Sequence, residues 1–427
     1  MKTRARWLIP VVVGLLGIGA YFGIVRIRAE RSLQRAKAAF VLQDWRTARG
    51  ELRSYLAVVP SNDEARLRLA EAYFKDSALN SERAVVSAIQ QLEFIRRESP
   101  LWPAARVQEA RMCLFVRMET HRAEQLLRES LAVAPENVEA HYVLWKLLDL
   151  TGRSHLAEPH FRKVLESTPL EQRPFCLREW YMSQFYPATA NPELDQLMGF
   201  LQSGAAYDSS TELQRLVKFR EREPRAALNH ADVARWFSLE GDPKAALELL
   251  QQALDTTDAP LEESFFVATL AQVLFDLGEF DRALKIYRAW PGERSGYEYF
   301  RLGAIFSDEV ERNYEQAIRS YREVISVWPG QADWRIQNRL ARCLAKAGNE
   351  AEAEKMRRQA KSVELLMETK IHAPLRQLLA KPDQLEICQQ MTQFYEQLGL
   401  AYEAQHWREQ VDRLQLIPSK SVTRRTD

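Results

Sequence analysis

Hydrophobic and small residues recur at helical spacing along most of this chain. Between residues 138 and 169, apolar positions such as Leu144 repeat on both sides of Gly152, and Pro169 follows the second run. Residues three or four apart share one face of a helix, so this pattern predicts two helices joined by a turn at the glycine. Ala157 is small enough for the second helix to pack closely on the first, and a proline ends a helix because it lacks the backbone N–H. The segment therefore predicts a helix–turn–helix unit.

The same helix–turn–helix pattern returns along the chain at a nearly constant interval. Within each of two groups, successive copies of the small residue of the second helix are 34 to 39 residues apart. The alanines of these groups are Ala48, Ala84, Ala123 and Ala157, and then Ala246, Ala283, Ala317 and Ala353. This pattern resembles the tetratricopeptide repeat (TPR), which has a period of about 34 residues. The resemblance covers most of residues 31–416. It implies an all-α fold, a TPR-like α-solenoid of stacked antiparallel helix pairs.

An apolar segment precedes the repeats. Trp7–Val25 contains no charged residue over nineteen positions, and basic residues flank it on both sides. About 20 apolar residues in a helix span the hydrocarbon core of a bilayer. The segment therefore predicts one transmembrane helix, retained as an anchor. One alternative is a cleaved signal peptide, because Gly17 and Gly19 imitate the small residues of a cleavage site. The other is a buried helix of a soluble protein.

The flanking charges bear on the orientation of this segment. Arg26, Arg28 and Arg31 make the C-terminal flank the richer in positive charge, which by the positive-inside rule favours the cytoplasm for that flank. The short basic start of the chain is instead typical of a secretory segment. We expect the N-terminus in the cytoplasm, a single pass through an inner (cytoplasmic) membrane of bacterial type, and a periplasmic repeat body.

Prolines and glycines interrupt the repeat and suggest the domain organisation. A stretch at 170–224 loses the repeat register but keeps apolar helical pieces at 175–185, 193–202 and 212–222, so we expect a packed irregular joint rather than a flexible linker. A long helix is expected at 360–371, before Pro374. The expected parts are 1–30 (basic start and membrane helix), 31–169 (first array), 170–224 (joint), 225–361 (second array), 362–418 (long helix and terminal unit) and 419–427 (disordered tail).

Composition and motifs argue against several function classes. Lys and Arg number 59 and Asp and Glu 58, a net charge of +1, so the chain lacks the basic excess typical of nucleic-acid binders. The 4 cysteines lie far apart, and the histidines lack metal-binding spacing. Phosphate-binding and nucleophile motifs are also missing. We therefore predict no catalytic residue, no metal, no cofactor and no small-molecule substrate.

Stacked helix pairs form a concave face, lined by the first helix of each pair, on which partners bind. On this register the candidate contact residues are Tyr142, Lys146, Arg235, Gln272, Phe300, Arg335, Asn338, Arg339 and Arg342. Arg335, Arg339 and Arg342 share one helix stripe, and guanidinium groups suit carboxylates. An exposed, solvated basic face is the alternative. Changing these three arginines together to alanine is expected to weaken partner binding without unfolding the array.

The sequence therefore predicts a non-catalytic, membrane-anchored scaffold. It would hold protein or peptide partners in its concave face and contact the membrane through residues 7–25. The alternative is an accessory subunit of an envelope polysaccharide-synthesis or secretion complex. An enzyme in its own right would need a buried cluster of titratable groups, which the motifs do not indicate.

Overall fold

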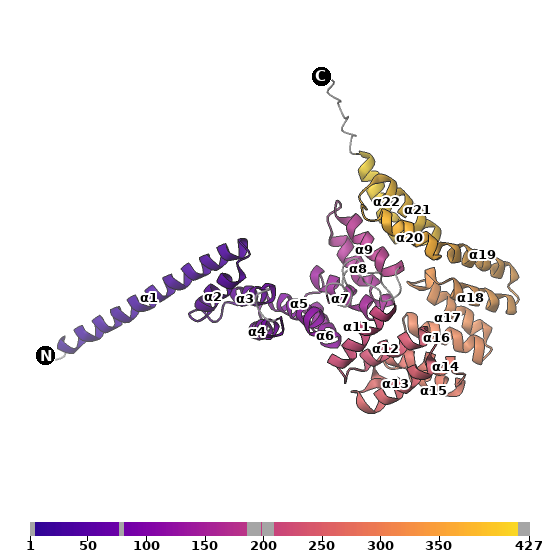
Figure 1. Ribbon diagram of the computed structural model, residues 1–427, viewed down its shortest axis with the longest axis horizontal. Helices are drawn as coiled ribbons and strands as arrows, with labels where there is room; N and C mark the ends of the chain where they lie inside the picture. The colour runs from indigo at the N-terminus through magenta and orange to yellow at the C-terminus, as the bar shows by residue number, and fades with distance from the viewer. Residues whose placement is uncertain (1–4, 77–80, 186–197, 199–208, 417–427) are drawn as a thin grey trace, which may run out of the picture. The chain divides into compact units, whose positions relative to one another are not determined.

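The described part of the chain is helical throughout its regular elements (Figure 1). The computed structural model describes the backbone of residues 5–76, 81–185, 198 and 209–416, and their side chains except those of residues 5–20, 22, 81, 209 and 369. Successive helices pack side by side through short turns, which confirms the predicted all-α helical repeat. Two compact units are formed, residues 1–118 with 122–137 and residues 119–121 with 138–427. The units thus change over near residue 138, and the joint expected at 170–224 stays a prediction.

The first unit consists of helix pairs built around small residues. Its helices are α1 (Ala5–Val41), α2 (Trp45–Leu56), α3 (Asp63–Lys75), α4 (Ser81–Glu93), α5 (Trp102–Met112), the π-helical turn η1 (Cys113–Arg117) and α6 (Thr120–Val133). The C-terminal half of α1 packs on α2, where Ala29 and Ala36 lie against Leu52 and Tyr55. Alanines at these positions let the two helix backbones approach closely.

The backbone of α1 is one helix from Ala5 to Val41. Among the residues whose backbone and side chains are both described, no helix is long and apolar enough to cross a membrane. The span predicted at residues 7–25 lies largely outside those residues, since the side chains of residues 5–20 and 22 are not described.

The second unit continues the same pairing. Its elements are α7 (Val138–Leu150), η2 (Ser154–Leu156), α8 (Glu158–Ser167), α9 (Arg173–Phe185), α11 (Ser209–Arg222), α12 (Ala227–Leu239), α13 (Pro243–Thr256), η3 (Pro260–Glu262), α14 (Ser264–Asp276), α15 (Phe280–Arg288), α16 (Tyr297–Ile305), η4 (Phe306–Val310), α17 (Tyr314–Ile325), η5 (Gly330–Ala332), α18 (Trp334–Lys346), α19 (Glu350–Leu366), α20 (Thr369–Leu378), α21 (Leu385–Leu398) and α22 (Ala401–Leu416). In both units, the alanines that mark the repeat in the sequence are at most 4% exposed. The predicted packing register is therefore the observed one.

The turn between the two helices of a pair contains a residue in the left-handed conformation. Gly241 has a φ of 88° and Gly348 a φ of 82° at this position. The next residue caps the second helix: the side chain of Asn349, for example, accepts a hydrogen bond from the backbone N–H of Glu352. Glycine adopts positive φ without steric cost, and Asn or Asp satisfies a free N–H group at the helix start. These two residue types therefore fix the turns before α13 and α19.

The helices around the expected joint and the expected long helix show how tertiary contacts override local pattern. α9 and α11 match the pieces expected at 175–185 and 212–222, while the piece at 193–202, apart from residue 198, and the tail at 419–427 lie outside the described residues. The single helix expected at 360–371 is broken, because Glu368 is extended between α19 and α20. This break redirects the chain, so that His372 of α20 is buried against Tyr181 of α9.

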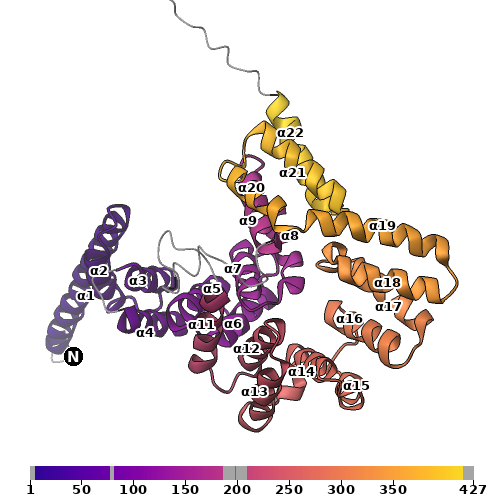
Figure 2. The same cartoon turned by 45° about the vertical axis from the view of Figure 1, so that its right-hand side comes forward.

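Helix α9 lies beside α20 and α22 in both views (Figures 1 and 2). The Nε1 of Trp180 donates a hydrogen bond to the Oε1 of Glu403 at 2.8 Å, and the Tyr395 hydroxyl donates to Gln184 at 2.8 Å. The Tyr181 hydroxyl lies 2.8 Å from the Nδ1 of His372. These partners are about 190 to 220 residues apart in the sequence. The early and late helices of the second unit are thus joined by a buried polar and aromatic contact, and the array is closed.

Candidate functional site

A cavity of about 430 Å³ lies across the first helices of four successive pairs, α12, α14, α16 and α18. These helices follow one another along an arc in Figure 2. The cavity, called the concave cavity below, is lined by Arg235, Ser238, Leu239, Ala268, Thr269, Gln272, Val273, Phe275, Asp276, Tyr297, Glu298, Arg301, Ile305, Asp333, Arg335, Ile336 and Arg339. Its position is the one that the repeat register assigns to the concave face.

A buried carboxylate organises the charges at the centre of the concave cavity. Glu298 is 6% exposed and pairs with Arg235 at 3.0 Å and with Arg301 at 2.9 Å. Burial alone would raise the pKa of Glu298, but the two guanidinium groups hold that pKa well below its usual range. Because a buried charge is costly unless it is paired and hydrogen-bonded, this triad fixes α12 and α16 relative to each other.

Helix α14 extends the polar network. Arg301 donates from Nη1 to the Oε1 of Gln272 at 2.8 Å, and Gln272 donates from Nε2 to the Oδ1 of Asp276 at 2.7 Å. The Ser238 hydroxyl donates to the other oxygen of Asp276 at 3.2 Å. Amide, carboxylate and guanidinium groups are therefore held in defined positions along the wall of the cavity.

The short turn between α7 and α8 reaches the same region. The ring of His155 in η2 lies 5.7 Å from the ring of Tyr297, which lines the cavity. Burial lowers the pKa of His155 to about 4, with Arg235 and Arg301 acting in the same direction and Glu298 opposing them. At neutral pH the imidazole is therefore uncharged. The turn that contains η2 therefore covers one side of the concave face.

The arginines of α18 differ in their surroundings. Arg339 pairs with Glu309, and Arg342 pairs with both Asp308 and Glu309 of η4. Asp308 is 1% exposed. Arg335 is exposed and makes no ion pair with a described residue; its guanidinium lies 4.8 Å from the ring centre of Trp334. Of the three arginines, Arg335 is therefore the one whose guanidinium is not paired with a described carboxylate.

The structure brings four of the predicted contact residues together in the concave cavity. These are Arg235, Gln272, Arg335 and Arg339. Asn338 and Arg342 lie on the same helix, α18, but do not line the cavity, and Phe300 packs against the hydrophobic core instead.

Tyr142 and Lys146 of α7 lie elsewhere in the second unit. Both contact Glu179 of α9, the Tyr142 hydroxyl at 3.2 Å and the Lys146 Nζ at 2.9 Å. They therefore hold α7 to α9 and do not line the cavity. Whether any of the predicted residues binds a partner remains a prediction.

Sequence reasoning missed Arg301 and Glu298. Arg339 stands two residues before the small residue Ala341, and Arg301 stands two residues before Gly303, the equivalent position in the preceding repeat. The position equivalent to Arg339 in the preceding repeat is therefore Arg301, and this comparison would have selected Arg301 in place of Phe300. The burial of Glu298 depends on Arg235, 63 residues away, and a local pattern does not reveal such a partner.

The chemistry available in the cavity is that of polar recognition. In the part of the chain that the structure describes, no group of three or more His, Cys, Asp or Glu residues is placed to hold a metal ion. Glu298 is held as a carboxylate by two arginines and the His155 imidazole is neutral, so neither is set up to exchange a proton near neutral pH. The remaining groups can hydrogen-bond and pair with a ligand.

The helix pairs and their concave cavity define an α-helical repeat protein. The model of the tetratricopeptide repeat family matches residues 33–97 and 310–360, so these two segments are identified as tetratricopeptide repeats, as the alanine spacing predicted. None of the curated proteins compared with the chain matches its sequence.

The chain is also similar to several solved structures, all at low sequence identity and low TM-score. The pilF protein of Pseudomonas aeruginosa is 17% identical, with a TM-score of 0.26, and the match covers 53% of this chain and 92% of that one. A tetratricopeptide repeat protein of Parabacteroides merdae is 14% identical, with a TM-score of 0.29 and coverages of 69% and 98%. The structure of the APC/C hetero-tetramer Cut9–Hcn1 is 13% identical, with a TM-score of 0.34, and the match covers 90% of this chain and 94% of that one. At these sequence identities and TM-scores, the activities and partners of those proteins are not assigned to this chain.

Proposed function

We propose that this chain is a non-catalytic scaffold that binds a segment of another protein in the concave cavity. The main support for this proposal is the cavity of about 430 Å³ on the first helices of four successive pairs. Pockets of roughly 300–1,000 Å³ accommodate ligands the size of a few side chains. A tetratricopeptide array generally serves as a scaffold, and its stacked helices provide an extended concave surface.

The two sides of the cavity favour different side chains of a partner. Leu239, which is 72% exposed, and Phe275 provide an apolar wall at the ends of α12 and α14. Arg335 lies at the start of α18, where its guanidinium makes no ion pair with a described residue, although its backbone N–H donates to the Asp333 carboxylate at 2.9 Å. An extended peptide with an apolar residue near Leu239 and an acidic residue near Arg335 fits this arrangement, because a guanidinium pairs well with a carboxylate.

Binding is tested by selecting peptides from a random library against the full chain and then measuring their Kd for variants. Arg335→Ala and Gln272→Ala should each weaken binding by about 1–2 kcal/mol, roughly five- to thirtyfold in Kd. Glu248→Ala, an exposed change on the second helix α13, is the matched control and should leave Kd unchanged. Peptides that bind all three variants equally would refute the assignment of the cavity.

The triple alanine variant of Arg335, Arg339 and Arg342 is not a clean test of binding. Asp308 is buried, and Arg342 is its ion-pair partner. Removal of Arg342 leaves this buried carboxylate without that partner, which destabilises the fold. Arg342→Ala is therefore expected to lower the melting temperature, whereas Arg335→Ala should not. A single change at Arg335 separates recognition from stability.

Membrane anchoring through residues 7–25 is the second part of the proposal. Its support is the sequence: nineteen residues without a charge, flanked by basic residues. We place the anchor in an inner (cytoplasmic) membrane with the repeat body in the periplasm, where the partner would be another envelope protein. The alternative role, an accessory subunit of a polysaccharide-synthesis or secretion complex, is compatible with the same topology.

Protease accessibility tests the topology. The full chain is expressed in bacteria, and protease is added to spheroplasts. Digestion of the repeat body with survival of a short N-terminal fragment supports the periplasmic placement. Protection of the body until the membrane is opened would place it in the cytoplasm, and recovery of the chain in the soluble fraction would exclude the anchor.

A further inference from the structure

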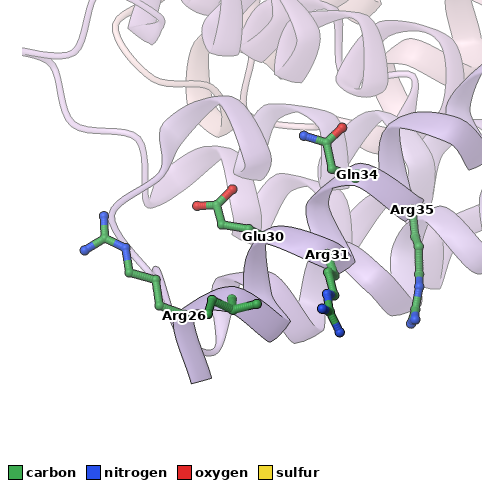
Figure 3. Close-up of a pocket in the computed structure, with 6 residues that line it drawn as sticks. Arg26, Glu30, Arg31, Gln34 and Arg35 are labelled. Carbon is green, nitrogen blue, oxygen red and sulfur yellow. The ribbon is translucent and has the colours of Figure 1, made fainter. Parts of the chain in front are cut away.

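Helix α1 presents a line of arginines on the face that does not pack on α2. Arg28, Arg31 and Arg35, here called the basic ladder, are spaced by three and four residues, so they share one helix face. Ala29 and Ala36 face α2 and are at most 3% exposed. The ladder residues are exposed. Figure 3 shows Arg31 and Arg35 directed to the same side of α1, away from Glu30 and Gln34.

The charges of the basic ladder are largely unneutralised. Arg28 and Arg31 make no ion pair with a described residue, and Arg35 makes only a long one with Glu51, at 3.5 Å, with its side chain 69% exposed. Glu30 is the only acidic residue between residues 26 and 41. An open depression of about 500 Å³ runs along this part of α1, and Arg31 and Arg35 line it.

The ladder continues the same helix as the apolar segment of residues 7–25. Ile24, at the end of that segment, and Ile27, just before the ladder, are 52% and 56% exposed, although both are apolar. At a rise of about 1.5 Å per residue, the ladder begins within roughly 5 Å of Val25 and ends roughly 15 Å from it along the helix axis. An anchor that ends near Val25 would hold Arg28 at the depth of the lipid headgroups. Arg31 and Arg35 would lie beyond that layer and reach back to it with their long side chains.

We propose that the basic ladder binds the phosphate groups of anionic lipids in the membrane that α1 enters. The inference rests on the proposed membrane anchor and adds to it a headgroup specificity. Guanidinium groups bind phosphate through paired hydrogen bonds, and basic residues beside a membrane gain attraction from anionic lipids. The occupant is a lipid headgroup because the apolar residues on the same helix lead directly into the ladder.

The experiment measures lipid selectivity of the full chain reconstituted into phosphatidylcholine vesicles that contain a minority of phosphatidylglycerol. Spin-labelled lipids of each type report the fraction immobilised at the protein. Phosphatidylglycerol should be enriched at the protein, with up to roughly a fivefold gain per arginine at low salt. High salt should reduce the enrichment.

Variants then assign the selectivity to the ladder. Arg28→Gln, Arg31→Gln and Arg35→Gln combined should abolish the enrichment, while lysine at the same three positions should retain most of it. Lys355→Gln, Arg358→Gln and Lys361→Gln on α19 remove the same charge from another exposed helix face and should change nothing. Circular dichroism and melting of each variant verify that it folds.

Three results would overturn the proposal. Equal immobilisation of both lipids, or enrichment that survives in the glutamine variant, refutes the ladder while leaving the anchor intact. Displacement of the lipid by inorganic phosphate at constant ionic strength would reassign the ladder to a free anion. Failure of the full chain to associate with either vesicle refutes the anchor itself, and the ladder proposal with it.

Discussion

A residue with positive φ lies in the turn of several described helix pairs, and not all of these residues are glycine. Arg312 occupies this position before α17 with a φ of 56°, while Gly348 occupies it before α19 with a φ of 82°. The left-handed conformation costs a residue with a Cβ roughly 1–2 kcal/mol. We expect Arg312→Gly to raise the free energy of unfolding by up to about 1 kcal/mol, and Gly348→Ala to lower it by about 1 kcal/mol.

Thermal and urea unfolding of the two variants measure this difference. A Cβ added at Gly348 meets no atom within 4 Å, so the expected loss reports backbone strain rather than packing. If Arg312→Gly lowers the melting temperature instead, the arginine side chain stabilises the fold by more than its left-handed backbone conformation costs.

Asp149 provides a pH-dependent prediction at the scale of one residue. It is 4% exposed on α7, and burial raises its pKa from an ordinary 3.8 to about 7, although Lys146 and the Ser183 hydroxyl oppose this. The folded state therefore binds the proton more tightly than the unfolded state. This group's contribution to stability is complete below about pH 4 and is lost as the pH rises to about 7.

Asp149→Asn removes this titration and keeps an oxygen for the hydrogen bond from Ser183. The variant should gain stability relative to the parent between pH 4 and pH 7, by roughly a few kcal/mol at the upper end. Chemical unfolding at several pH values measures the gain. A difference that stays constant over this range would contradict the raised pKa of Asp149.

At the scale of the element, the packing of α15 against α16 depends on the absence of one methyl group. A Cβ added at Gly303 would overlap the hydroxyl of Tyr287, whose Cζ would lie 3.2 Å away. Overpacking of this kind typically costs 1–3 kcal/mol. We therefore expect Gly303→Ala to destabilise the chain by about this amount.

The partner side chain supplies the control. In a Tyr287→Phe background the overlapping hydroxyl is gone, so the cost of Gly303→Ala should fall to less than half. A double-mutant cycle of the four proteins measures this coupling by thermal unfolding. Equal costs in the two backgrounds would show that the clash is relieved elsewhere, by movement of α15.

Elements of this kind could be predicted because they depend on neighbours in the sequence. The small residue of each second helix, the glycine turn and the amphipathic spacing all lie within one repeat, and they placed the buried alanines in register. The break at Glu368 could not be predicted in this way, because it places His372 against Tyr181, 191 residues away. The sequence around residue 368 shows only a helix-compatible pattern.

The concave cavity was partly predictable for the same reason. Arg235, Gln272 and Arg339 lie on the first helices at positions that the register turns inward. The ion-pair partners of these charged residues could not be predicted, since Arg342 pairs with Asp308 and two arginines share Glu298. The turn at His155 covers the cavity through a contact with Tyr297 that spans more than one hundred residues.

At the scale of the whole second unit, closure changes how the array should unfold. In an open solenoid each repeat contacts only its neighbours, so the last helices can fray independently. Here Trp180 of α9 is fully buried, stacks on Phe161 at 4.5 Å and donates a hydrogen bond to Glu403 of α22. The terminal helices are therefore tied to helices more than 200 residues earlier.

Trp180→Ala should consequently raise amide hydrogen exchange in α21 and α22, although the substitution lies in α9. Loss of a large buried aromatic side chain costs about 3–5 kcal/mol, and this loss falls on the contact that joins the two ends. Hydrogen exchange followed by mass spectrometry measures the effect helix by helix. Phe266→Ala, a comparable change in the core of α14, is the control: it should raise exchange around α14 and leave α22 protected. Equal protection of α22 in all three proteins would mean that the closing contact contributes little, and that α21 and α22 are stabilised by their own pairing.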